Sequence, residues 1–118
     1  MRNLIILSML FLTACNSKNK ENQKMLPIAT MQQTVWQLMK VDEYLSRQIQ
    51  TDTTIQPSLV KAQHYQQVFN LNKVDRVQFY ATMEYLDKHP LEMKLLLDSV
   101  EALSKREKSI EKGKISTY

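Results

Sequence analysis

Cysteine and glycine are nearly absent from this chain, and proline is rare. Among its 118 residues there are one Cys, one Gly and three Pro. A single Cys cannot form an intramolecular disulfide, so a domain of this size has to be stabilised by its apolar core. Little Gly and Pro beside many Gln, Lys, Leu and Met residues is typical of helices rather than of turn-rich β-structures. The composition therefore predicts an all-α fold.

A long apolar run is absent as well. The most apolar segment, Leu4–Leu12, covers nine residues, whereas a membrane-spanning helix needs about 20. Arg2 precedes this segment, and the small residues Thr13 and Ala14 follow it. A positive charge, a short apolar stretch and small residues are the parts of a cleaved signal peptide. Residues 1–14 are therefore predicted to be a lipoprotein signal peptide and are left out of the fold prediction.

The single cysteine stands directly after this segment. Leu12-Thr13-Ala14-Cys15 has the pattern of a lipobox, in which the thiol of the new N-terminal Cys takes up diacylglycerol. The alternative is a free Cys in a retained apolar anchor or in an uncleaved signal peptide. One acyl chain holds a protein only marginally in a membrane, whereas several chains anchor it stably. Cys15 is thus the predicted lipidation site, with membrane lipid as its partner.

A polar segment follows Cys15. Residues 16–24 carry no apolar side chain, which is typical of a flexible tether. The lipidated Cys and its tether are expected to span residues 15–27. Some Gram-negative lineages mark surface-exposed lipoproteins with acidic residues directly after the Cys, and residues 16–19 contain none. We therefore expect a lipid-anchored envelope protein at the outer membrane, facing the periplasm.

Charge and residue type exclude several classes of function. There are 16 Lys and Arg residues against 12 Asp and Glu residues, which is too small an excess for nucleic-acid binding. The chain has no Ser-His-Asp arrangement with a nucleophile elbow, no Gly-rich phosphate loop and no helix with paired His residues. After lipidation it has no thiol nucleophile either. The sequence therefore predicts neither an enzyme nor a metal or cofactor site.

Apolar spacing predicts four helices in one domain of residues 28–113, followed by a tail of residues 114–118. The predicted helices cover residues 30–49, 57–70, 76–88 and 90–112. Short connections favour antiparallel neighbours. The expected architecture is a small four-helix bundle, up-and-down or slightly irregular, with three long helices and one shorter.

Capping residues indicate where these helices begin. Pro57 and Pro90 suit the first position of a helix, because the missing N–H is not needed there. Asp75 is a suitable N-cap for the third helix. The first helix is expected to begin near Thr30, although Pro27 would allow a start one turn earlier.

Each predicted helix carries an apolar stripe that is expected to face the core. The stripe of the second helix is broad, which predicts burial on more than one side. In chain order, the stripes contain Met31, Val35, Leu38, Leu45 and Ile49; Leu59, Ala62, Tyr65, Val68 and Phe69; Phe79, Met83 and Leu86; and Met93, Leu96, Leu97, Val100, Leu103 and Ile110.

A carboxylate interrupts the first stripe. Asp42 lies between Leu38 and Leu45, and a buried carboxylate must be hydrogen bonded, paired with a cation, or neutral. One interpretation is a functional polar site between helices. The alternative is a structural pair with a Tyr, Arg or His of a neighbouring helix, or exposure at the edge of the stripe.

The end of the last predicted helix is basic. Gly113 is a natural residue to end it, and Lys108, Lys112 and Lys114 complement the negative end of the helix dipole. The basic run, which starts at Lys105, is compatible with contact to anionic lipid or to the cell wall. A solvated helix end explains it equally well.

Several motifs in the second half of the chain resemble those of a known family. They are Tyr65-Gln-Gln-Val68-Phe69, Val74, Phe79 with Thr82, Tyr85, His89-Pro90 and Asp98-Ser99-Val100. Together they are similar to the domain of unknown function 4296 family of small Gram-negative lipoproteins, which likewise begin with a lipobox. The resemblance covers residues 28–108. It implies localisation and architecture, and it implies no substrate because the family has no known activity.

The family's recurrent polar residues fall here on Asp42, His89, Asp98 and Ser99. They form a candidate polar site between helices, and the alternative role for them is helix packing and capping. Asp42, His89 and Asp98 would have to converge to act as acid and base, and nothing in their spacing requires this.

The favoured hypothesis is a membrane-anchored lipoprotein whose helical accessory domain binds a protein partner of the envelope. The alternative is a small-ligand carrier, which a large dry pocket with Asp42 facing it would support. A solid core with an exposed apolar groove would support partner binding. Such a groove has candidate lining residues, although Met also commonly fills gaps in a core. They are Met25, Met31, Met39, Met83 and Met93.

Overall fold

The computed structural model describes residues 24–116. Within this part the chain forms four α-helices and no strand: α1 (Ile28–Thr51), α2 (Pro57–Leu71), α3 (Arg76–Asp87) and α4 (Pro90–Ile115). This confirms the predicted all-α class. The predicted signal peptide, the lipidation site Cys15 and the tether up to residue 23 lie outside the described residues. No helix between residues 24 and 116 is long and apolar enough to span a membrane.

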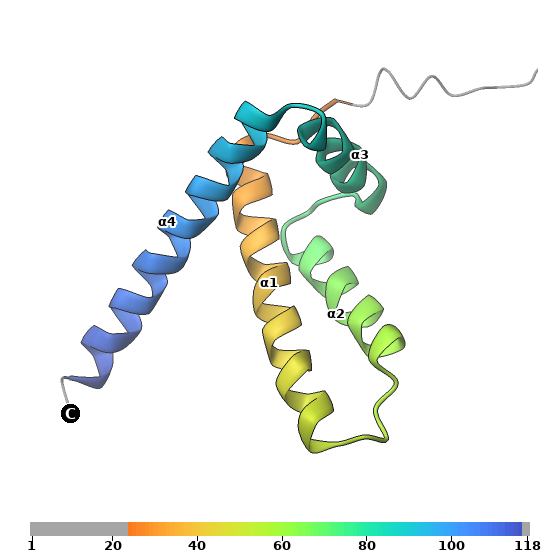
Figure 1. Cartoon of the computed structure of the whole chain (residues 1–118), viewed down its shortest axis with the longest axis vertical. Helices are drawn as coiled ribbons and strands as arrows, with labels where there is room; N and C mark the ends of the chain where they lie inside the picture. Colours follow the sequence, from red (N-terminus) through yellow and green to blue (C-terminus); the bar gives the residue numbers. More distant parts are fainter. Residues whose placement is uncertain (1–23, 117–118) are drawn as a thin grey trace, which may run out of the picture.

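α1 is the central helix of the array. It packs against α2 on one side and against α4 on the other, and the short α3 lies near the end at which α1 begins (Figure 1). α1 and α2 run antiparallel, as expected for two helices joined by a short connection. The molecule is therefore organised as two helix pairs that share α1.

α1 and α4 run in the same direction (Figure 1). The Gln32 side chain donates a hydrogen bond to the Ser99 carbonyl at 2.8 Å, and one turn further along α1 the Trp36 indole donates to Glu107 at 2.7 Å. An up-and-down bundle would place the first and last helices antiparallel, so the array is the irregular form of the bundle. The cause is α3, whose 12 residues carry the chain across one end of the array instead of back along it.

Local signals in the sequence fix where three of the helices begin. Asp75 caps α3 by accepting a hydrogen bond from the Gln78 N–H at 2.9 Å, which confirms the predicted cap. Pro57 and Pro90 occupy the first positions of α2 and α4, also as predicted. Each of these signals acts within one helical turn, so a distant contact cannot override it easily.

α1 begins two residues before the expected Thr30. It starts at Ile28, directly after Pro27, and the Pro27 carbonyl accepts the first helical hydrogen bond from the Met31 N–H at 3.0 Å. Thr30 already lies inside the helix, where its carbonyl accepts a hydrogen bond from the Thr34 hydroxyl at 2.8 Å. The earlier start that Pro27 allowed is thus the one adopted.

The sequence predicted that the last helix ends at Gly113, and this prediction is wrong. α4 continues to Ile115, and Ser116 is its C-cap residue. No glycine of the described part has a positive φ, so Gly113 adopts the ordinary helical conformation. Glycine costs about 1 kcal/mol relative to alanine inside a helix but does not by itself end one.

The core lies where the four helices converge. Its largest fully buried side chains are Phe69, Met31, Leu86, Leu96 and Thr34. Phe69 packs against Phe79, with ring centroids 5.1 Å apart. Among the described residues, no buried side-chain N or O atom lacks a hydrogen-bond partner. The core is therefore filled with large side chains and its polar groups are satisfied.

Four expected members of the apolar stripes are exposed instead of buried: Ala62 of α2 and three larger residues. Leu59, Leu97 and Ile110 are 55%, 54% and 59% exposed, so their predicted burial is wrong. Leu59 is exposed because the main packing of α2 is against α1 alone, which leaves part of its broad apolar face uncovered. Ile110 lies past Glu107, where the last described hydrogen bond between α4 and α1 is made.

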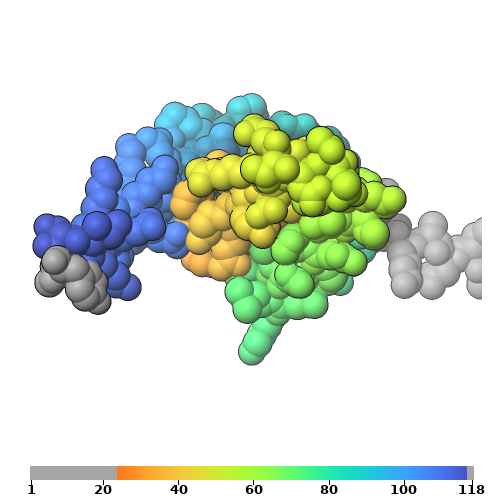
Figure 2. Space-filling model, turned by 90° about the horizontal axis from the view of Figure 1, so that it is seen from below, coloured from red at the N-terminus to blue at the C-terminus, as the bar shows by residue number. Residues whose placement is uncertain are grey.

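The C-terminal end of α4 extends beyond the rest of the array. Every residue from 108 to 116 is exposed. In the view from below, this end of α4 projects away from the surface that α1 and α2 form (Figure 2). Only the first two thirds of α4 therefore contribute to packing.

Candidate partner-binding site

Asp42 joins α1 to α2 through two residues one helical turn apart. The Tyr65 hydroxyl donates to both carboxylate oxygens of Asp42, at 2.9 Å each. Lys61 Nζ lies 3.1 Å from Oδ1 of the same carboxylate and 5.0 Å from the centre of the Tyr65 ring. We call these three residues the Asp42 clamp. The clamp is the pairing with a neighbouring helix's Tyr that the sequence left open.

The clamp shifts the pKa of two of its groups. Burial, followed by the hydrogen bond to Asp42, raises the pKa of the Tyr65 phenol. Hydrogen bonds to Asp42 and then to Tyr65 raise the pKa of the Lys61 ammonium. Both groups therefore keep their protons at neutral pH, which suits them to hold the helices together.

The ion pair within the clamp is largely solvated. The Lys61 and Asp42 side chains are 50% and 46% exposed, and an ion pair of this kind contributes little to stability because water screens it. The Tyr65 hydrogen bonds, on the more buried side of the clamp, fix the carboxylate in place. The charges of Asp42 and Lys61 thus remain available at the surface between α1 and α2.

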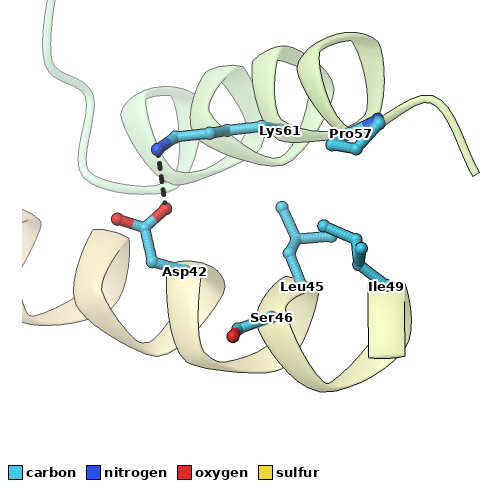
Figure 3. Close-up of a pocket in the computed structure, with 6 residues that line it drawn as sticks. All are labelled: Asp42, Leu45, Ser46, Ile49, Pro57 and Lys61. Atoms are coloured by element: carbon cyan, nitrogen blue, oxygen red, sulfur yellow. Dashed lines mark ion pairs between the residues drawn. The ribbon is translucent and has the colours of Figure 1, made fainter. Parts of the chain in front are cut away.

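An open hollow lies beside the clamp (Figure 3). Its volume is about 260 Å³, and Leu45, Ile49 and Pro57 provide its apolar wall. Leu45 and Ile49 point from α1 toward α2, whereas Asp42 and Lys61 approach each other at one end of the hollow. An apolar hollow with a charged rim can receive one apolar side chain of another molecule, and the rim can form hydrogen bonds to the residues beside that side chain.

A second hollow of about 260 Å³ lies on α1 alone. Its lining is mainly charged and consists of Lys40, Glu43, Tyr44 and Arg47. Because one helix provides all of these residues, the hollow has no second wall to orient a bound group. The hollow beside the Asp42 clamp is therefore the better candidate.

His89 lies at the start of α4, away from the clamp. It is the N-cap residue of α4, and its ring stacks on the Tyr85 ring with centroids 3.9 Å apart. Nδ1 is 2.7 Å from the Tyr85 carbonyl oxygen. These contacts connect α3 to α4, which is the packing role that the sequence left as the alternative for this residue.

Asp98 and Ser99 interact within α4. Lys94 lies one turn before Asp98 on the exposed face of α4, and its Nζ is 2.6 Å from an Asp98 carboxylate oxygen. The Ser99 hydroxyl donates to the Leu95 carbonyl at 2.8 Å. Across residues 24–116, no hydrogen bond or ion pair joins any two of the four predicted polar site residues, so each serves a separate contact.

The candidate methionines serve mainly in core packing, the alternative to a groove that the sequence offered for them. Met31 is fully buried, while Met83 and Met93 are half-buried against the core. Only Met25 and Met39 are exposed. Among the described residues, no group of three His, Cys, Asp or Glu side chains is placed to bind a metal ion.

The sequence prediction missed a polar contact between α1 and α4. The Trp36 indole N–H and the Lys40 ammonium both donate to the same Glu107 oxygen, at 2.7 and 3.0 Å. The hydrogen bond from Trp36, and then that from Lys40, lowers the pKa of Glu107. Two signals pointed to this contact: Trp36 and Lys40 share a helix face, and Glu107 continues the apolar stripe of α4.

It also missed how the chain enters the domain. The Leu26 N–H donates to the Thr82 hydroxyl at 3.1 Å, and the Gln78 side chain donates to the Lys24 carbonyl. The Thr82 and Gln78 side chains that make these two hydrogen bonds both lie on α3. The segment before α1 is therefore fixed to α3, at the end of the array where α1 and α4 both begin.

These features define a small all-α domain built around one long helix, with an open hollow rather than an enclosed chamber beside Asp42. The chain belongs to the family described as Domain of unknown function (DUF4296), whose model matches residues 22–109. The match covers α1 to α3, the Asp42 clamp and most of α4. It confirms the resemblance seen in the sequence. No curated protein and no solved structure matches the chain.

Proposed function

We propose that the protein is a lipoprotein anchored at the periplasmic face of the outer membrane, and that its helical domain binds an envelope protein through the hollow between α1 and α2. The lipobox ending at Cys15 supports the anchorage. Confinement to a membrane raises the effective concentration of any partner in the same membrane. A modest recognition surface is then sufficient for binding.

The observation that carries the partner-binding proposal is the composition of the hollow. Leu45 is buried at its floor, and the Asp42–Lys61 pair presents both signs of charge at its rim. A partner can insert one apolar side chain and satisfy its own backbone or polar groups on the fixed charges. Interfaces commonly combine a desolvated apolar centre with a polar rim in this way.

The alternative of a small-ligand carrier is less well supported. A carrier encloses most of its ligand's surface, whereas the hollow beside Asp42 is open to solvent. The centre of the helical array is filled with large side chains. The shape of the site therefore favours a side chain presented by another protein.

The anchorage is tested by replacing Cys15 with Ser. We expect the wild-type protein in the membrane fraction with residues 1–14 removed. The Cys15→Ser variant should lack the acyl chains and leave the membrane fraction. Recovery of this variant in membranes, with its first residues intact, would contradict the proposal.

Partner binding is tested with a charge placed in the hollow. Ile49→Lys introduces an ammonium beside Leu45, and Val77→Lys makes the same change at an exposed apolar residue of α3. A photo-crosslinking residue at Ser46, next to the hollow, should yield a defined protein adduct in cells. We expect Ile49→Lys to remove this adduct and Val77→Lys to keep it, with circular dichroism confirming that both variants fold.

Equal adducts from the two variants would show that the hollow is not the docking site. A small molecule recovered with the purified domain and displaced by Ile49→Lys would favour the carrier instead.

A further inference from the structure

The C-terminal end of α4, residues 108–115, carries cations that the rest of the described structure does not neutralise. We call this segment the α4 tip. Lys108, Lys112 and Lys114 form no ion pair among the described residues, and Glu111 is the one acidic residue of the tip. All of these side chains are exposed. The tip therefore presents a net positive charge to solvent.

Most charges of α4 before the tip have a partner among the described residues, in contrast, and Arg106 is the exception. Lys94 pairs with Asp98, and Lys105 pairs with Glu101. Glu107 accepts hydrogen bonds from α1. The excess positive charge of this helix is thus concentrated where α4 projects away from the other described helices (Figure 2).

The tip lies at the opposite end of the molecule from the point where the chain enters the domain. Lys24 and Leu26 are held by α3, close to where α4 begins (Figure 1). The 26 residues of α4 extend over about 39 Å at 1.5 Å per residue. A tether to a membrane at the entry point would therefore leave the tip directed away from that membrane.

We propose that the α4 tip binds the carboxylate-bearing polymer of the cell wall, peptidoglycan, while the other end of the chain is held in the outer membrane. The exposed lysines complement the carboxylates of its peptide stems. Lys108 and Lys112 are one helical turn apart, so both can face the same strand of polymer. Anionic lipid of the anchoring membrane is disfavoured, because the tip lies at the far end of α4 from the point where the tether enters the domain.

This inference rests on the proposed anchorage for the direction in which the tip points, but the binding itself does not require the lipid. The family match ends at residue 109, and the exposed tip makes no packing contribution to the core. Substitutions in the tip are thus expected to leave the fold intact.

The test is co-sedimentation of the mature full-length protein, in mild detergent, with purified peptidoglycan sacculi. Replacing Lys108, Lys112 and Lys114 together with Gln should reduce the affinity by at least about tenfold at low salt, by analogy with lysines near other anionic surfaces. The matched control replaces Lys73, Lys88 and Lys94 with Gln, which removes the same charge elsewhere. This control should bind like the wild type. Glu111→Gln should bind more tightly, and binding should weaken as salt is raised from low to physiological concentrations.

Equal losses from the two triple variants would overturn the proposal, because the position of the charge would then not matter. Binding to phosphatidylglycerol vesicles that exceeds binding to sacculi would assign the tip to lipid and also overturn it. The Cys15→Ser variant separates the two proposals: it should leave the membrane fraction and still sediment with sacculi. If it stays in membranes, the anchorage fails while the binding of the tip is still measured.

Discussion

The two faces of α1 are held by different interactions. The α2 face is covered along most of its length, first by apolar side chains such as Leu38 and Phe69 and then by the Asp42 clamp. The face of α1 that contacts α4 is apolar only near the beginning of both helices, where Leu96 of α4 is buried. It then becomes polar where Trp36 and Lys40 of α1 donate to Glu107, and no described hydrogen bond joins the two helices beyond these. α4 is thus held to α1 by its first two thirds, and its end projects past these contacts.

The largest effect is expected at Leu96, which is fully buried in the first half of α4. Leu96→Ala should lower the free energy of unfolding by about 2–5 kcal/mol, because it leaves a cavity in the core. The matched variant Leu97→Ala, at the adjacent exposed position, should change it by less than about 0.5 kcal/mol. Urea denaturation of both variants measures the difference. Similar losses would mean that α4 is not fixed by this side of the helix.

A smaller effect is expected where the α4 face becomes polar. Glu107→Gln weakens two hydrogen bonds to α1 and should cost about 1 kcal/mol at neutral pH, with allowance for solvent screening. The pKa of Glu107 is lowered in the folded protein from its ordinary value of 4.5. Its contribution is therefore fully present above pH 4.5 and is lost as the pH falls through the lowered folded-state value.

Wild type and Glu107→Gln should accordingly converge in stability when unfolding is followed from pH 7 to pH 3. A difference that is constant over this range would show that the carboxylate charge is not the source of the stabilisation.

The smallest effect is expected at the clamp on the other face of α1. Tyr65→Phe removes the hydroxyl that binds Asp42 and should cost about 0.5–1 kcal/mol near pH 7. The pKa of Tyr65 is raised in the folded protein above its ordinary value of 10.0. The stabilisation is therefore present below pH 10 and disappears as the pH rises through the folded-state value.

Thermal melts of wild type and Tyr65→Phe between pH 7 and pH 11 test this expectation. The two curves should approach each other at the alkaline end. If the variant loses nothing at neutral pH, the clamp does not stabilise the α1–α2 pair.

The elements that the sequence predicted well depend on neighbours within a turn. Pro57, Pro90 and the Asp75 cap each determine a helix start from local geometry, and the structure follows them. Apolar periodicity likewise identified the residues able to enter a core. It could not tell which of them a neighbour would cover, which is why Leu59 and Leu97 are exposed.

The candidate site was only partly predictable for the same reason. Asp42 was noticeable because it interrupts an apolar stripe, and its partner is a tyrosine of a neighbouring helix. The hydrogen bond between Trp36 and Glu107 joins residues 71 positions apart. The helix face that Trp36 and Lys40 share does not tell which distant carboxylate they contact. The parallel direction of α1 and α4 was equally hidden, because it follows from how α3 crosses the end of the array.

The parallel pair has a mechanical consequence. The chain enters beside the beginning of α4 and leaves at its far end, so a pull between the two ends acts along the axis of this helix. The two parallel helices α1 and α4 would then be sheared along their axes. All contacts between them would bear the force together and would not break one at a time. Such a geometry shares the load among Gln32, Trp36 and the apolar side chains around Leu96, and it suits a body that is stretched between two supports.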